Sequence, residues 1–320
     1  MKVSNARLNE IIMKKTPQKN LLKLPKIDIL YEDADFVAVN KPAGLVVHSD
    51  GKTVEPLLTD WVVENYPKTA KVGEPLVIGP REEAVAIASV VADPAAASSA
   101  APAEDEEDAT TPERIAPTVI QRPGIVHRLD RGTSGVIIIA KNQKAYAALK
   151  EQFHARSVSK KYLAFVYGEF ADPADKYGTI NRPIGRSKKD FRRFSAQRGA
   201  RGEMRPAETW YTVLASRKGL DDGTGRRAGG GYAFLEVEPK TGRTHQIRVH
   251  FKAINHPIVC DDLYAAEREC ALGFGRPALH SSSVEFMNMK GKRVVATAPM
   301  PADFKKACKE LDIDVKVINS

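Results

Sequence analysis

The alternation of apolar and polar residues predicts a chain of short strands with a few helices between them. Near the N-terminus, apolar segments at 27–31 and 36–40 flank the turn-forming residues 32–35, which indicates a β-hairpin. The uninterrupted apolar run at 136–140 is typical of a buried strand. Further strands are expected at 161–168, 209–215 and 232–237.

Helical spacing of apolar residues predicts three helices, at 53–66, 142–155 and 244–254. The first carries Pro56 in its first turn, and the second begins at Asn142, whose side chain suits an N-cap. In the third, His245 and Arg248 share one face. Hairpins with intervening helices indicate an α+β fold, in which helices and loops flank a mainly antiparallel mixed sheet.

One segment departs from this pattern. Between residues 84 and 117 the sequence reads AVAIASVVADPAAASSAAPAEDEEDATTPERIAP, a low-complexity run with little apolar surface to bury. We expect a disordered insertion at about residues 82–119, inside a single domain formed by residues 27–320. Residues 1–26 then form a basic N-terminal extension.

Charge is distributed unevenly around this insertion. The chain carries a net charge of +9, but residues 81–120 contain nine acids and two bases, which leaves +16 on the remainder. Such a basic surface suits a polyanion, although excess lysine can also serve solubility alone. The segment GRSKKDFRRFSAQRGARGEMR, residues 185–205, interleaves Arg192 and Arg193 with Phe191 and Phe194. Because such residues suit phosphates and unpaired bases, we predict a flexible loop that faces RNA.

Other features limit the cellular setting. No apolar stretch approaches the roughly 18 residues of a membrane span, and residues 1–15 lack the apolar centre of a secretory signal, so we expect a cytoplasmic protein without a membrane partner. The three cysteines, Cys260, Cys270 and Cys308, lack CxxC spacing, which argues against a zinc site. We expect all three to be reduced thiols.

Ionisable residues gather in the stretch RPGIVHRLDRGTSGVIIIAKN, residues 122–142. Asp130 lies between Arg128 and Arg131 and precedes a Gly-Thr-Ser-Gly turn, whose amides and hydroxyls can stabilise an ionised carboxylate. Such a carboxylate can act as a nucleophile, or it can simply pair with an arginine and cap the turn. Two more segments carry candidates: SVSKKYLAFVYGEF has Tyr162, and EPKTGRTHQIRVHFKAINHPIVCDDLY has Arg243, His245, Arg248 and His250.

Together these segments resemble the RluA-type pseudouridine synthases. The resemblance is carried by YEDADFVAVNKPAGLVVH, GIVHRLDRGTSG, KKYLAFVYG, TGRTHQIRVH, HPIVCDDLY and ALHSSSVEF, in the right order from residue 29 to about 300 apart from the insertion. It implies the pseudouridine synthase catalytic fold and an enzyme that isomerises uridine to pseudouridine in structured RNA, with no cofactor or metal. Ribosomal RNA of the large subunit (23S) is the expected substrate, and transfer RNA is the alternative.

The resemblance also implies roles for three residues. Asp130 would be the nucleophile, attacking the sugar C1′ or uracil C6 or assisting a glycal-type route. Tyr162 would lie against the everted uracil and take the proton that leaves during isomerisation. Arg243 would pair with Asp130 and keep it charged, since a nucleophilic carboxylate needs a positive neighbour.

A further group of residues is expected to bind RNA. Eversion of a base costs a few kcal/mol of unstacking, and the planar guanidinium of Arg128 can fill the space left in the helix or contact a phosphate. The full predicted RNA-binding set is Arg128, His127, Thr133, His245, Gln246, Arg248, Arg192 and Arg193.

The chain departs from the family pattern in two places. Gly132 stands where relatives often carry an acidic residue. Residues 1–26 are too few for the S4-type RNA-binding domain of many relatives, so target choice would rest on the catalytic domain, the basic segment 14–26 and the loop 185–205. We expect a monomer without a required protein partner.

Three other function classes fit the sequence less well. A metallohydrolase could use His245, His250 and His256 with Asp261 or Asp262, but these lack the HExxH pattern. An RNA-binding module without catalysis would show the same charge. Hydride or phosphate transfer is disfavoured because no glycine-rich phosphate loop follows a strand.

Overall fold

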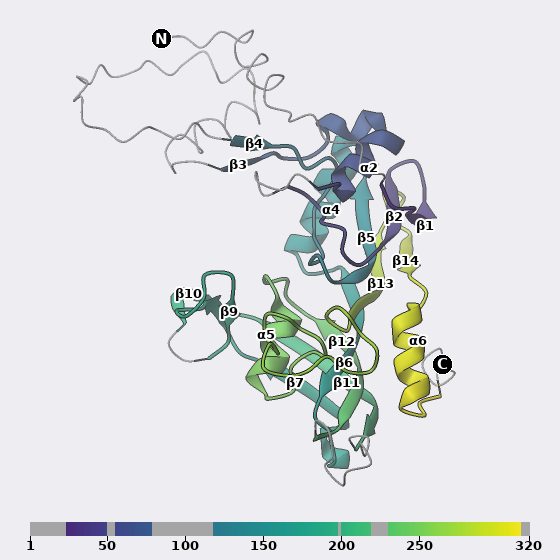
Figure 1. Cartoon of the computed structure of the whole chain (residues 1–320). Coiled ribbons are helices and arrows are strands. Elements are labelled where there is room, and N and C mark those ends of the chain that lie inside the picture. Colours follow the sequence, from purple (N-terminus) through teal and green to yellow (C-terminus); the bar gives the residue numbers. More distant parts are fainter. Residues whose placement is uncertain (1–23, 50–54, 79–117, 198–199, 219–229, 315–320) are drawn as a thin grey trace, which may run out of the picture.

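The computed structural model describes residues 24–49, 55–78, 118–197, 200–218 and 230–314 (Figure 1). One large sheet runs through the molecule from the hairpin of residues 28–41 to the strands below it (Figure 1). Its strands, in spatial order, are β1 (Asp28–Glu32), β2 (Phe36–Lys41), β5 (Ser134–Ala140), β13 (Leu279–Met287), β6 (Ser159–Tyr167), β12 (Tyr232–Pro239), β11 (Glu208–Arg217) and β7 (Tyr177–Asn181), and β14 (Arg293–Thr297) pairs with β13.

Antiparallel pairing dominates this sheet. The exception is the short parallel contact between β5 and β13, where His280 lies opposite Ser134 and Ser281 opposite Gly135. Gly135 has φ +109°, and a Cβ at this position would lie 2.1 Å from the Ser281 carbonyl oxygen. The expected α+β fold with a mainly antiparallel mixed sheet is therefore confirmed, and the close β5–β13 contact explains one glycine of the Gly-Thr-Ser-Gly turn.

Strand β5 is buried along its whole length because both of its faces are covered. One face packs on helix α4 (Gln143–His154), with Val136 and Ile138 in the same apolar cluster as Leu149. The other face packs on helix α2 (Leu58–Asn65), with Ile137 and Ile139 beside Trp61. This two-sided burial explains why the strand is apolar without alternation. It also makes β5 a rigid support for the loop that precedes it.

The second half of the sheet is also covered on both faces. Helix α6 (Ala302–Glu310) places Phe304 5.6 Å from Phe165, measured between ring centroids, while helix α5 (Gln246–Ala253) packs Phe251 against Tyr211 at 5.5 Å. Figure 1 shows α5 in front of β6, β12 and β11. The start of α5 therefore lies near the loop that enters β5.

Most of the expected elements are present with small shifts in their ends. The hairpin β1–β2 is antiparallel, and the Asn142 side chain caps α4 by accepting the Ala145 N–H at 2.9 Å. Helix α2 begins at Leu58, so Pro56 is not in its first turn as we expected. The reason is that Leu57 stays extended, bridged to Val46, and donates its N–H to the Asp60 carboxylate at 2.9 Å.

Two other expectations were wrong. The segment 185–205 is not simply a flexible loop, because it forms a three-stranded sheet, which we call the small sheet: β8 (Ile184–Arg186), β9 (Phe194–Ser195) and β10 (Arg201–Arg205). Cys260 and Cys270 are joined in a disulfide, because the turns between them bring their Cα atoms within 4.7 Å. With three cysteines, one thiol must stay unpaired within the chain, but the other two can still form a disulfide.

The two sides of the predicted insertion meet in a ladder. Strands β3 (Leu76–Ile78) and β4 (Thr118–Ile120) pair antiparallel, with Ile78 opposite Thr118. The insertion expected at 82–119 lies outside the described residues except for its last two, which belong to β4. Two 3-10 turns, at Pro67–Lys71 and Pro173–Lys176, complete the described elements. In the described part of the chain, no helix is long and apolar enough to span a membrane.

Candidate active site

A basic cleft opens where the loop before β5, the start of β6 and the loop between β12 and α5 meet. Its volume is about 610 Å³. Asp130 is the single acidic residue among the described residues that line it. The six arginines and lysines of its lining are Arg128, Arg156, Lys160, Lys240, Arg243 and Arg248. Low-dielectric walls lined by one sign of charge attract an anion, so the cleft suits a polyanionic ligand.

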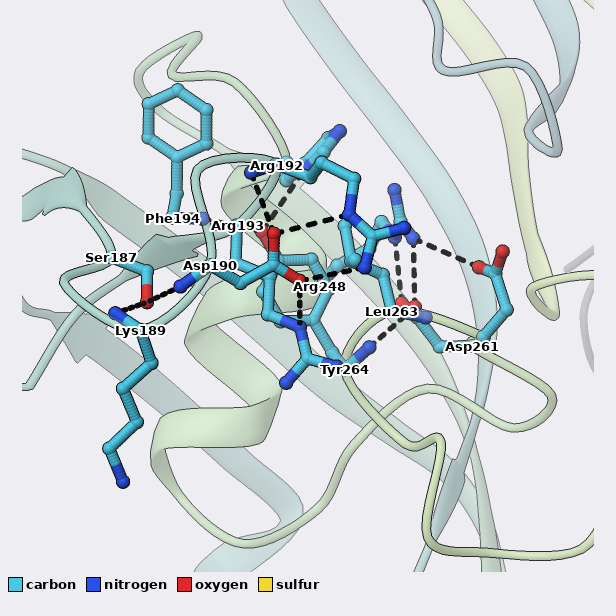
Figure 2. A network of polar contacts seen from close by, with 12 residues as sticks. Ser187, Lys189, Asp190, Arg192, Arg193, Phe194, Arg248, Asp261, Leu263 and Tyr264 are labelled. Carbon is cyan, nitrogen blue, oxygen red and sulfur yellow. Dashed lines mark hydrogen bonds and ion pairs between the residues drawn. The ribbon is translucent and has the colours of Figure 1, made fainter.

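Asp130 is held by Arg248, which lies one turn into α5. The Arg248 Nη1 donates to Asp130 Oδ2 at 3.0 Å, while its Nε and Nη2 donate to the two oxygens of Asp261, both at 2.7 Å. Asp261 is buried and also accepts the backbone N–H groups of Leu263 and Tyr264, both at 3.0 Å. Figure 2 shows the Arg248–Asp261 pair beside Tyr264. The Arg248 guanidinium thus binds two carboxylates at once, that of the buried Asp261 and that of Asp130 in the cleft.

Burial and charge act in opposite directions on Arg248. Burial disfavours its charged form, but the hydrogen bonds and charge of Asp261, with those of Asp130, raise the pKa of Arg248 above its ordinary value. The guanidinium therefore carries a permanent positive charge beneath the cleft. Our expectation that Arg243 would pair with Asp130 was wrong, because Arg243 donates its Nε to the Pro206 carbonyl at 3.1 Å. Arg243 nevertheless lines the same cleft.

The second oxygen of Asp130 faces away from Arg248. The Nε2 atom of His245 lies 3.9 Å from Asp130 Oδ1, beyond hydrogen-bonding distance, and burial lowers the pKa of this histidine, which favours its neutral form. No hydrogen bond within the described residues reaches Oδ1, whereas Oδ2 is held by Arg248. The carboxylate thus has one anchored oxygen and one that can react.

Tyr162 lies on β6 and forms part of the cleft wall. It is partly buried between two apolar clusters. Burial, together with the negative charge of Asp130, raises the pKa of Tyr162 to about 12, so its phenol keeps its proton at neutral pH. An uncharged aromatic side chain at this place offers a flat apolar surface and one hydroxyl.

Two basic residues that the sequence did not indicate, the buried Lys41 and the partly buried Arg276, support the loop that carries Asp130. The Lys41 side chain is fully buried, and its Nζ donates to the carbonyl oxygens of Pro42 and Leu45, at 2.9 and 2.8 Å, and more weakly to that of Arg131, at 3.3 Å. Burial lowers the pKa of Lys41 to about 7, although Asp130 opposes this shift. Arg276 donates to the Gly132 carbonyl at 3.1 Å. Lys41 and Arg276 therefore hold the backbone carbonyls of Arg131 and Gly132, the two residues that follow Asp130.

Gly132 has a steric reason at this position. A Cβ there would lie 2.8 Å from Cδ of Pro277, closer than real Cβ atoms approach their neighbours. The proline ring cannot move aside as a flexible side chain would. The ring of Pro277 thus gives a steric reason for glycine at position 132.

Several predicted RNA-binding residues have partners inside the protein. The buried Gln246 accepts from Thr241 Oγ1 at 2.6 Å and donates to the Glu208 carbonyl at 2.9 Å. These contacts hold its side chain inside the protein and do not fit the expected contact with RNA. His127 accepts the Ile138 N–H at 2.9 Å, and burial lowers its pKa to about 3, so it has no charge to offer a phosphate. Thr133 is buried, and its N–H donates to the Asp130 carbonyl at 3.1 Å.

Arg128 differs from these residues. It is exposed at the edge of the cleft, immediately before the buried Leu129 and the cleft residue Asp130. Of these three consecutive residues, Arg128 is exposed to solvent, Leu129 lies in the core and Asp130 lines the cleft.

His245 does not belong to α5 as we expected. It is the residue before the helix and has a left-handed backbone with φ 56°. This conformation turns its ring toward Tyr264, whose hydroxyl lies 2.9 Å from His245 Nδ1. The same hydroxyl accepts the N–H of Phe194, in the small sheet, at 2.9 Å. Tyr264 therefore connects the small sheet with the edge of the cleft.

The small sheet presents the predicted pair Arg192 and Arg193 on its outer turn. Arg192 donates its Nε and Nη2 to Asp190 at 3.1 and 2.9 Å, and Arg193 Nε lies 3.4 Å from the same carboxylate (Figure 2). Phe191 is 81% exposed, whereas the Phe194 ring lies 5.2 Å from the Arg186 guanidinium. An exposed aromatic ring next to two arginines in the chain is suited to an unpaired base.

The histidines of the metallohydrolase alternative are occupied by other partners. His250 lies between Thr209 Oγ1 and the Arg182 carbonyl, both at 2.9 Å, and His256 stacks on Phe170 with ring centroids 4.2 Å apart. Across the described residues, no group of three or more His, Cys, Asp or Glu side chains could hold a metal ion.

The chain is similar in sequence to proteins of one known family. Residues 35–253 match the RNA pseudouridylate synthase family. An uncharacterized RNA pseudouridine synthase of Synechocystis sp. is 31% identical over 281 residues, which cover 88% of this chain and 67% of that protein. Another, from Mycobacterium tuberculosis, is 33% identical over 298 residues, covering 92% and 76%.

Two further similarities concern a named enzyme and a solved structure. The ribosomal large subunit pseudouridine synthase D of Xanthomonas campestris is 29% identical over 300 residues, covering 90% of this chain and 70% of that enzyme. The structure of human RNA pseudouridylate synthase domain containing 1 superimposes with a TM-score of 0.56 at 24% identity, covering 86% of this chain and 84% of the human one. At that identity the likeness extends to the fold alone.

Proposed function

Because the chain belongs to the RNA pseudouridylate synthase family, in agreement with the RluA-type motifs, we propose that it isomerises specific uridines of large-subunit ribosomal RNA. That it is an RNA pseudouridine synthase follows from the family match and its relatives. The choice of ribosomal RNA is supported by relatives in Xanthomonas campestris and Zymomonas mobilis whose names specify the ribosomal large subunit. Transfer RNA remains the second candidate.

Asp130 acts as the nucleophile in this proposal. The observation that carries it is a carboxylate held through one oxygen by Arg248, with its other oxygen unbonded within the described residues, in a cleft lined by six basic side chains. Such a carboxylate is oriented before substrate arrives. Oδ1 attacks either the sugar C1′ or uracil C6, or assists departure of the base through a glycal-type route.

Tyr162 forms the wall against which the detached uracil turns. In the reaction the C1′–N1 bond breaks, C1′ bonds to C5 of the same uracil, the proton on C5 leaves, and N1 takes up a proton from solvent. Because the pKa of the Tyr162 phenol is raised to about 12, we propose that its neutral hydroxyl relays the C5 proton, passing its own proton on to water or to the Asp130 carboxylate. The isomerisation conserves all atoms and electrons, which is why we propose no redox cofactor or metal.

Arg128 assists eversion of the target nucleotide. Its exposed position at the edge of the cleft, two residues from Asp130, is suited to entering the stack from which the uridine leaves. The small sheet would hold RNA next to the cleft through Arg192, Arg193 and Phe191. We further propose that the enzyme works as a cytoplasmic monomer formed by one catalytic domain, residues 27–320.

The test is pseudouridine mapping of ribosomal and transfer RNA from cells that lack the protein. Cells complemented with the wild type should regain one or a few ribosomal pseudouridines, whereas cells complemented with Asp130→Asn should not. Asp190→Asn, which changes a partly buried aspartate outside the cleft, is the matched control and should restore the sites.

The outcome separates the candidate substrates. Sites lost from transfer RNA alone would replace ribosomal RNA as the substrate. Pseudouridines that persist in every RNA, or that return with Asp130→Asn, would contradict the proposed target or the proposed nucleophile.

A further inference from the structure

Ser281 carries a buried hydroxyl on β13 that the proposed function has not used. Its side chain is fully buried, and no group of the described residues reaches its Oγ within the distance and angle limits of a hydrogen bond. The next residue differs, because Ser282 Oγ donates to the Lys161 carbonyl at 3.1 Å. Since a buried hydroxyl without a partner is costly, the position of Ser281 requires a reason.

The residue directly across from Ser281 is Tyr162. The antiparallel pair β13–β6 places these two residues opposite each other, so their side chains lie on the same face of the sheet. On the other side of β13, Gly135 of β5 lies opposite Ser281. A tyrosine, a serine and a glycine therefore form one row across three adjacent strands.

The ring of Tyr162 extends over the small residues of this row. It packs against the apolar cluster of β6 and β12, which contains Leu235, and against that of β2 and β5, which contains Ile137. Because β13 lies between β5 and β6, a ring that touches both clusters crosses β13 at Ser281. The small side chain of Ser281 leaves room for the ring and places a hydroxyl beneath it.

The contact between the two hydroxyls is loose but acts on Tyr162. Burial, the largest effect, raises the pKa of Tyr162 to about 12, Ser281 opposes this rise, and the charge of Asp130 adds to it. A neighbouring hydroxyl lowers the pKa of a phenol when it donates to the phenol oxygen, since this stabilises the phenolate. Hydrogen bonds of active sites are often long without substrate and shorten when substrate binds.

We propose that Ser281 is a positioning residue, which donates a hydrogen bond to the Tyr162 oxygen and so directs the phenol O–H into the cleft. This rests on the proposed function, in which Tyr162 relays the C5 proton of uracil. With one lone pair of the phenol oxygen held by Ser281, the other can face C5 while the O–H faces water or Asp130. The phenol is then oriented for the relay before RNA arrives.

The first test is a double-mutant cycle on stability, which needs no RNA. Ser281→Ala is made in the wild type and in Tyr162→Phe, and unfolding in urea is measured for all four proteins. Ser281→Ala should raise the unfolding equilibrium constant about three- to tenfold more in the wild type than in Tyr162→Phe, the ratio expected for one hydrogen bond. The control Ser283→Ala, at a partly buried position of the same strand, should have the same effect in both backgrounds.

The second test measures turnover, with pseudouridine formation in a transcript of large-subunit ribosomal RNA followed by tritium release from uridine labelled at C5. Ser281→Ala should lower kcat about five- to tenfold and leave KM unchanged, because the hydroxyl orients Tyr162 and does not bind RNA. Ser281→Cys keeps the side-chain volume but donates weakly, so its kcat should lie between those of Ser281→Ala and the wild type. Ser283→Ala should keep the wild-type kcat and KM.

Three results would overturn the inference. Equal effects of Ser281→Ala on stability in the two backgrounds would show that the hydroxyls are not bonded. An unchanged kcat in Ser281→Ala, or a fully restored kcat in Ser281→Cys, would reduce Ser281 to a packing residue. If the wild type releases no tritium from this transcript, the proposed substrate fails, and the stability cycle still decides whether Ser281 binds Tyr162.

Discussion

Two networks of aspartate and arginine lie close together in this protein and differ in burial (Figure 2). In the buried network, Arg248 joins Asp130 to Asp261, and its side chain is 7% exposed. In the exposed network, the exposed side chains are the arginines: Asp190, itself 17% exposed, holds Arg192, which is 65% exposed, and Arg193, which is 41% exposed. Hydrogen-bond lengths are similar in both, so the distances alone do not show which network matters.

Exposure to solvent determines how much each network depends on its ion pairs. A buried charge that loses its partner cannot recover hydration, whereas an exposed one can. The buried network is therefore suited to fixing a reactive carboxylate, and the exposed one can release its arginines to RNA at little cost. Five predictions, ordered by size, test this contrast.

The largest effect is expected from Asp130→Asn. The amide keeps the shape of the side chain but removes the nucleophilic charge, so pseudouridine formation should fall by at least about 10³-fold. Tritium release from C5-labelled RNA measures this loss. Asp190→Asn should remain within about twofold of the wild type, and equal losses in both variants would contradict the contrast.

Arg248→Met should follow, because it leaves Asp261 buried without its cation. The free energy of unfolding should fall by about 3 to 5 kcal/mol, as measured by urea denaturation. The control is Arg192→Met, for which a change below about 0.5 kcal/mol is expected. A similar loss in the two variants would mean that burial does not separate the networks.

Acid should destabilise the buried region through His280. Burial, and then the charge of Arg276, lower the pKa of this histidine to about 4, so between pH 6.5 and 4 the unfolded chain binds a proton that the folded protein does not. Stability from this group is present above pH 6.5 and is lost as pH falls, by up to about 3 kcal/mol. Urea denaturation of the wild type and His280→Asn across this range measures it, and identical pH slopes would refute the assignment.

Tyr264→Phe should have a smaller effect at the junction between the networks. The variant loses the hydroxyl that binds His245 and the Phe194 N–H, a loss of about 1 kcal/mol for each hydrogen bond. We expect KM to rise more than kcat falls, because the small sheet loses its attachment while Asp130 keeps Arg248. A selective fall in kcat would show instead that Tyr264 acts on the reacting groups.

The smallest effect is expected from Arg192→Ala. RNA affinity should fall at low salt and approach that of the wild type at high salt, because one exposed phosphate contact is lost. The salt dependence of Kd measures this, with kcat unchanged. An effect that persists at high salt would show that Arg192 makes a desolvated contact.

The sequence predicted which residues share the cleft better than it predicted their contacts. Asp130, Tyr162 and Arg243, which the family resemblance grouped, line one cleft. Asn142 caps α4 as its local sequence predicted, because an N-cap depends on neighbours within a few residues. The partner of Asp130 was assigned to the wrong arginine of the right segment. The left-handed backbone at His245 turns the chain between Arg243 and Arg248, and no local pattern announced that turn.

The sequence by itself determined the α+β class, most of the strands and helices, the family and the loop that carries Asp130. Tertiary structure alone decided that Arg248 and Asp261 anchor Asp130, that Lys41 lies beneath the loop, that Pro277 requires glycine at 132 and that Cys260 meets Cys270. The physical reason is the separation along the chain over which each kind of interaction acts. Periodicity and capping act between near neighbours, whereas Asp130 and Arg248 are 118 residues apart and meet only because the strand order of one sheet places β5 and α5 around the same cleft.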